Sequence, residues 1–217
     1  MQTTNERSAG ISLMVGSFLM IVTMVLHPVG GNFEHLLAIS DMGIIAHSIA
    51  ILAIPLMAYG YWGIMNQLGS AVFLSRIGFS FMCFGLVAVM IAATLNGLVL
   101  MLLVKSYAGS SDAVIEGIRP IFRFNHYFNL ANDYIYMAAV GLSTLFWSVA
   151  ILKTRQLPVW LAYAGIFMVL SAFLTLLSGF VFTDVRGFSL FIFGTAAWTV
   201  LMGLFLIRES GREATAV

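Results

Sequence analysis

Residues 123–136 read RFNHYFNLANDYIY and lead directly into a long apolar segment. At about 100° per residue, the polar side chains of this stretch fall within an arc of about 120° on a helix. A polar helix face does not point into hydrocarbon, because each unpaired polar group there costs several kcal/mol. The stretch therefore predicts a helix whose polar wall faces other helices or a wet cavity. The members of this wall are Asn125, His126, Asn129, Asn132, Asp133 and Tyr136.

The composition of the chain predicts a polytopic membrane protein. Hydrophobic residues make up 61% and charged residues 9%, with a mean hydropathy of +1.01. Soluble domains carry about 25% charged residues. The net charge of +1 and the lack of a basic run argue against a nucleic-acid partner. A single cysteine, Cys83, excludes an intramolecular disulfide and a CxxC redox pair.

Six apolar segments are near or above the roughly 20 residues that a membrane-spanning helix needs. They cover residues 9–27, 42–64, 77–104, 127–152, 158–182 and 187–207. The fold class expected is therefore all-α, with residues 1–217 forming a single domain that is a six-transmembrane-helix bundle. Pro120 suits the first turn of a helix. The fourth helix is accordingly expected to begin outside the membrane, around residues 119–122.

Six crossings place both termini on one side of the membrane, and the distribution of basic residues predicts that this side is cytoplasmic. The terminal side carries Arg7, Arg76, Lys153, Arg155, Arg208 and Arg212, and the other side carries Lys105, Arg119, Arg123 and Arg186. The expected location is a bacterial inner membrane, crossed several times. A weak internal sequence repeat, with a polar residue near the outer end of the first, third and fifth helices, suggests three helical hairpins.

Histidine, amide and acidic side chains gather on the external side of this topology. All four histidines, His27, His35, His47 and His126, lie there, and Asn96 is expected about 12 Å inside the outer end of the third helix. The inner half of the spans contains no charge or amide. This asymmetry predicts an outward-open pocket rather than a continuous pore. The expected ligand-binding residues are His47, Asn96, Asn125, His126, Asn129, Asn132, Asp133 and Tyr136.

Three functions remain open at this level. Amide side chains both donate and accept hydrogen bonds, which suits the binding or transport of a small polar or amphipathic molecule. Alternatively, His47 and His126 bind a transition metal or haem in an intramembrane enzyme or redox protein, with His126 and Asp133 as candidate catalytic residues. In the third reading the polar wall contacts another membrane protein or a second copy of the chain. Polar contacts between membrane helices stabilise at about 0.6 kcal/mol each.

Overall fold

In the computed structural model, residues 2–215 are described, with side chains from residue 5 to residue 208, and the described chain is helical without strands. Arg212, one of the residues in the charge comparison, lies outside the described side chains. The helices are α1 (Gln2–Leu26), α2 (Phe33–Ala38), α3 (Ser40–Gln67), η1 (Gly69–Ala71), α4 (Val72–Ala92), the π-helical segment η2 (Ala93–Val99), α5 (Leu100–Ser106), α6 (Asp112–Thr154), α7 (Val159–Leu177) and α8 (Val185–Thr215).

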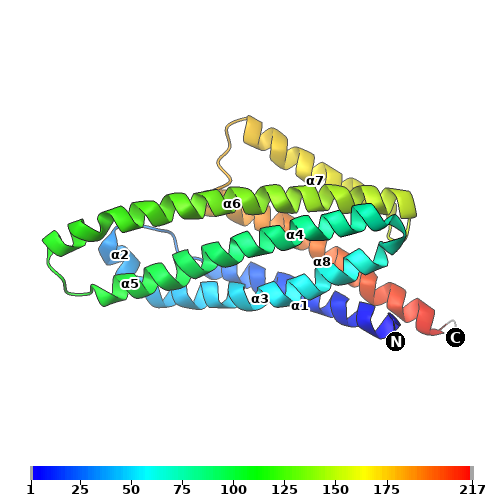
Figure 1. Ribbon diagram of the computed structural model, residues 1–217, viewed down its shortest axis with the longest axis horizontal. Coiled ribbons are helices and arrows are strands. Elements are labelled where there is room, and N and C mark those ends of the chain that lie inside the picture. Colours follow the sequence, from blue (N-terminus) through cyan, green and yellow to red (C-terminus); the bar gives the residue numbers. More distant parts are fainter. Residues whose placement is uncertain (1, 216–217) are drawn as a thin grey trace.

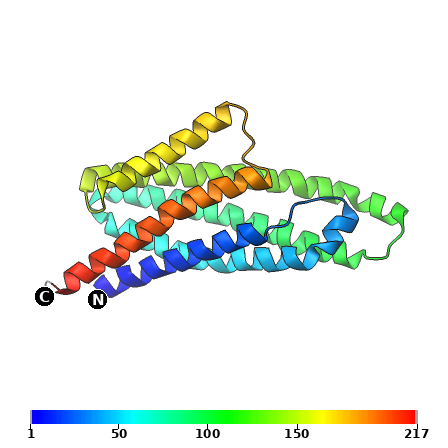
Figure 2. The ribbon, with the colours of Figure 1, turned by 180° about the vertical axis from the view of Figure 1, so that it is seen from behind.

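These helices form six continuous helical segments that are long and apolar enough to cross a membrane. The prediction of a six-helix, multi-pass membrane protein is thereby confirmed. The third span is one continuous rod, residues 69–106, built from η1, α4, η2 and α5. The start of α1 and the end of α8 lie at the same end of the bundle (Figure 1). The short helix α2 and the loop that follows α5 lie toward the opposite end, here called the loop end (Figures 1 and 2).

The helices pack in two groups. Helix α1 lies between α3 and α8, and the α1–α8 crossing is close because glycines meet there: a Cβ added at Gly10 would stand 2.7 Å from the carbonyl oxygen of Gly203. Helix α4 packs along α6 on the other side of the bundle. Helix α7 contacts α6 and α8 and then leans away from them toward the loop end (Figures 1 and 2).

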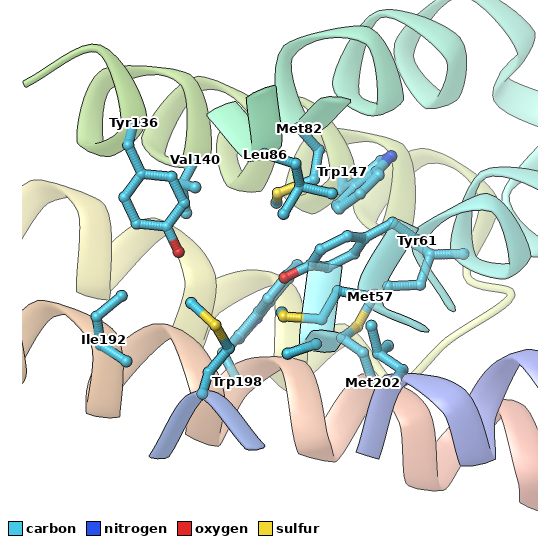
Figure 3. Close-up of a cluster of buried hydrophobic side chains, with 14 of the residues drawn as sticks. Met57, Tyr61, Met82, Leu86, Tyr136, Val140, Trp147, Ile192, Trp198 and Met202 are labelled. Carbon is cyan, nitrogen blue, oxygen red and sulfur yellow. The ribbon is translucent and has the colours of Figure 1, made fainter. Parts of the chain in front are cut away.

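A core of buried apolar side chains surrounds Trp147, Tyr61 and Trp198 (Figure 3). The indole of Trp147 donates to the carbonyl oxygen of Ser75 (3.1 Å), and that of Trp198 donates to the carbonyl oxygen of Leu161 (2.9 Å). These bonds satisfy the only polar atoms of two large buried rings, as burial in an apolar interior requires. This part of the bundle is therefore a packed apolar core.

Two helices differ from the sequence expectation at the loop end. Helix α6 begins at Asp112 and has 43 residues, about 64 Å in length, so it extends well beyond the roughly 30 Å hydrocarbon core. Pro120 consequently lies inside this helix, not in its first turn. Helix α7 ends at Leu177 because Gly179 takes φ +89°, a left-handed conformation that glycine adopts without strain.

Candidate functional site

The π-helical segment η2 shapes the loop-end half of the third span. Its wider turn interrupts the regular helical register and is a feature found often at functional sites. Within it, Asn96 accepts a hydrogen bond at Oδ1 from Nδ2 of Asn125 on α6 (2.9 Å). A Cβ added at the next residue, Gly97, would overlap the imidazole of His47 on α3. The segment thus contacts α6 through Asn96 and α3 through Gly97, and only glycine fits against His47.

His47 lies in contact with a second imidazole, that of His27, which follows the end of α1. The ring centroids are 4.8 Å apart and the planes are inclined by 60°. Nδ1 of His27 lies 3.0 Å from the carbonyl oxygen of Pro28, and Nδ1 of His47 lies 2.7 Å from that of Gly43. Because a carbonyl oxygen only accepts, Nδ1 is the protonated nitrogen in both neutral rings. Each Nε2 therefore carries a lone pair.

The pKa of His27 is lowered to about 4, mainly because burial disfavours the charged ring and secondarily because His47 is adjacent. The hydrogen bond to Pro28 opposes this shift without cancelling it. His27 is therefore neutral at neutral pH.

The predicted polar wall of α6 is buried only in part, and its members bind different partners. Asn129 donates from Nδ2 to Oδ2 of Asp133 (2.9 Å), and Asn132 donates to the carbonyl oxygen of Phe128 (2.9 Å). Asn132, Asp133 and Tyr136 are all buried. The ring of Tyr136 packs against Phe188 and Phe191 of α8, with centroids 6.0 and 6.1 Å away. Among the side chains of residues 5–208, Asp133 is thus bonded to one amide and to no cation.

The structure places the remaining sequence candidates elsewhere. His126 is exposed and packs edge-on against Tyr127, so the imidazole beside His47 is that of His27. His35 lies in α2, where its Nε2 is 3.0 Å from the carbonyl oxygen of Val29. Among the side chains that the structure describes, no group of three or more His, Cys, Asp and Glu residues is placed to hold a metal ion.

An apolar groove with a volume of about 560 Å³ lies between α6, α7 and α8. Its α6 wall includes Met137, Val140, Gly141 and Thr144, α7 contributes residues such as Met168 and Phe173, and α8 contributes Phe191 and Thr195. No charged side chain lines it. Sequence reasoning missed the groove, because it arises from the tilt of α7. The small residues on the side of α6 that faces α7 were the only feature of the sequence that could have indicated this groove.

One edge of the groove continues the polar wall along one column of α6, whereas other lining residues of α6, such as Ala138 and Leu142, lie further round the helix. At about 100° per residue, Met137, Val140 and Thr144 each lie within about 40° of Asp133 around the helix axis, and Met137 is about 6 Å further along it. Asn129 lies on the same column, one turn toward the loop end. Phe191 connects the two regions directly, since it lines the groove and also touches Tyr136. The column is therefore polar at the loop end and apolar along the groove.

The chain matches no known family model, and comparisons with curated proteins and with solved structures likewise found no match.

Proposed function

We propose that this membrane protein binds an amphipathic small molecule from the bilayer. Its hydrocarbon part occupies the groove between α6, α7 and α8, and its polar group meets Asn129 and Asp133. The proposal includes the orientation expected from the sequence: both termini in the cytoplasm of a bacterial inner membrane, and the polar end of the site in the outer leaflet.

The observation that carries this proposal is the continuity of the α6 column from Asp133 into the groove. A volume of about 560 Å³ lies within the roughly 300–1,000 Å³ of ligand pockets. Asp133 and Asn129 lie outside the groove lining, on the α6 column that continues into its edge. An apolar groove with a carboxyl and an amide on that column matches a molecule with a hydrocarbon part and a hydrogen-bonding head. A buried acidic side chain inside a transmembrane bundle is expensive and is by default a functional group.

The geometry favours binding from the side of the membrane over passage through the protein. Helix α7 leans away from α6 toward the loop end, which leaves the groove open toward lipid (Figures 1 and 2). Trp147, Tyr61 and Met57 fill the bundle on the terminal side of the polar wall (Figure 3). If the molecule is transported, a path through this core requires repacking, whereas binding requires none.

The test is to identify the molecules that co-purify with the protein in mild detergent, by mass spectrometry. Gly141 is suited to the key variant, because it lines the groove and a Cβ added there would meet only Val169, at 3.8 Å. Gly141→Leu places a branched side chain in the groove, and Gly141→Ala is the matched control. We expect a specific amphiphile with the wild type and with Gly141→Ala, and at least a 10-fold loss with Gly141→Leu.

Asp133→Asn and Asp133→Leu test the polar end separately. Asn keeps the size and a hydrogen-bonding group, whereas Leu removes both donor and acceptor, so retention should fall in the order wild type, Asn, Leu. Bulk membrane lipids in unchanged proportions in every variant, including Gly141→Leu, would refute the proposed function.

A further inference from the structure

We propose that His27 and His47, together with the thioether sulfurs of Met24 and Met101, form a binding site for a soft monovalent metal ion of the Cu(I) type. This site is separate from the groove and does not depend on the proposed function. It joins the end of α1 to α3 and α5 at the loop end of the bundle.

Each imidazole makes the kind of backbone hydrogen bond that metal-binding histidines usually make. Metal-binding histidines commonly donate one ring N–H to a carbonyl or carboxylate, which fixes the tautomer and directs the other nitrogen to the metal. Both rings have this arrangement, with Nδ1 bonded to the carbonyl oxygens of Pro28 and Gly43. Neither Nε2 has a hydrogen-bond partner among the described residues.

Two buried methionines belong to helix turns that adjoin the histidine pair. Met24 precedes His27 by one turn and is 7% exposed. The neighbouring residue Thr23 donates a hydrogen bond to the carbonyl oxygen of Ala46 (3.3 Å). This turn of α1 therefore packs against the turn of α3 that carries His47. Met101 is 4% exposed, and its sulfur lies 3.2 Å from the position of a Cβ at Gly43, the residue whose carbonyl oxygen holds His47.

The ligand types and the local charge select the ion. Thioether sulfur favours Cu(I), and imidazole suits copper as well as zinc. No acidic side chain joins the two histidines in a group of three or more ligands among residues 5–208. A divalent ion would therefore add two uncompensated charges to a partly buried site, whereas Cu(I) adds one. Neutral nitrogen and sulfur ligands around a single charge are the arrangement with the smaller desolvation cost.

The experiment is an anaerobic Cu(I) titration of the full-length protein in mild detergent, in competition with the chromophoric chelator bicinchoninate. We expect one Cu(I) per chain in the wild type. His47→Gln and His27→Gln should each weaken binding by more than the roughly 10- to 100-fold that loss of a supporting residue costs. Met101→Leu keeps the volume of the side chain and should reduce the sulfur contribution to the copper X-ray absorption spectrum, leaving that of Met24. His126→Gln is the matched control and should bind as the wild type does.

Several outcomes would overturn the proposal. One is a wild type that keeps no Cu(I) against the chelator, and another is binding that is unchanged in both His27→Gln and His47→Gln. Tight Zn²⁺ binding without Cu(I) binding would refute the choice of a soft monovalent ion. Size-exclusion profiles show which variants fold. If His47→Gln does not, His27→Gln decides, because His27 is half-buried and follows the end of its helix.

Discussion

Adding one methyl group at Gly97 is predicted to destabilise the protein, although alanine is a better helix former than glycine. A Cβ at this position would lie 2.5 Å from Cδ2 of His47 and closer still to its Cβ and Cγ. Carbon atoms in contact are normally about 3.5–4.0 Å apart, so the imidazole or the backbone must move by about 1 Å or more. Overpacking of this kind costs about 3 kcal/mol, and the helix preference for alanine returns about 1 kcal/mol. The net expectation for Gly97→Ala is a loss of about 2 kcal/mol.

Gly141→Ala is the matched control, because the same chemical change is made in another membrane helix where the nearest atom to the new Cβ is 3.8 Å away. It should be neutral or stabilise by up to about 1 kcal/mol. Unfolding by sodium dodecyl sulfate from mild-detergent micelles, followed by circular dichroism, measures both variants. A wild-type midpoint for Gly97→Ala, or equal shifts for both variants, would show that His47 does not pack against Gly97 as described.

Three further predictions concern other parts of the structure. Trp147→Phe should destabilise by about 2–3 kcal/mol in the same assay, because it leaves a cavity and removes the donor to the carbonyl oxygen of Ser75; an unchanged midpoint would contradict this. Lys105→Met should shift the midpoint by less than about 0.5 kcal/mol, since its ion pair with Asp41 is exposed; a larger loss would mean that the pair is structural. Thermal stability should fall as the pH drops from 6.5 toward 4, by at most about 3 kcal/mol from His27, because its pKa is lower in the folded state and the unfolded chain binds the extra proton. His27→Gln should remove this component, and a pH profile identical to that of the wild type would refute it.

The number and character of the spans could be predicted from the sequence because hydrocarbon imposes a simple requirement. A segment of about 20 apolar residues has to form a helix there, since only a helix satisfies its own backbone groups. The positions at which helices begin and end outside the hydrocarbon are less constrained, because water can satisfy the backbone groups there. Residues 112–126 mix charged and apolar side chains and form no continuous apolar run, yet they continue α6 by several turns at its loop end.

The polar wall shows which part of a site can be predicted from periodicity. The angular spacing correctly placed Asn132, Asp133 and Tyr136 on the buried side of α6. It could not give their partners, because these depend on how neighbouring helices are shifted along one another. The contact of Asn96 with Asn125 arises in a π-helical turn that periodicity does not indicate.

The histidines illustrate the same limit. His27 and His47 are separated by a loop and the short helix α2, and their rings meet because α1 and α3 lie side by side. His126 belongs to the same external group by sequence, but it is exposed on the extended part of α6. Depth in the membrane can be estimated from residue counts, whereas pairing between helices requires their relative rotation.

The most direct test of the amphiphile site is an electron cryomicroscopy map of the protein in a lipid nanodisc. The α6–α7–α8 groove should contain one elongated density whose polar end lies within hydrogen-bond distance of Asn129 or Asp133. The density should be lost in Gly141→Leu and kept in Gly141→Ala. Helix α7 packed closed against α6, or groove density indistinguishable from the surrounding lipid in all three proteins, would contradict the account.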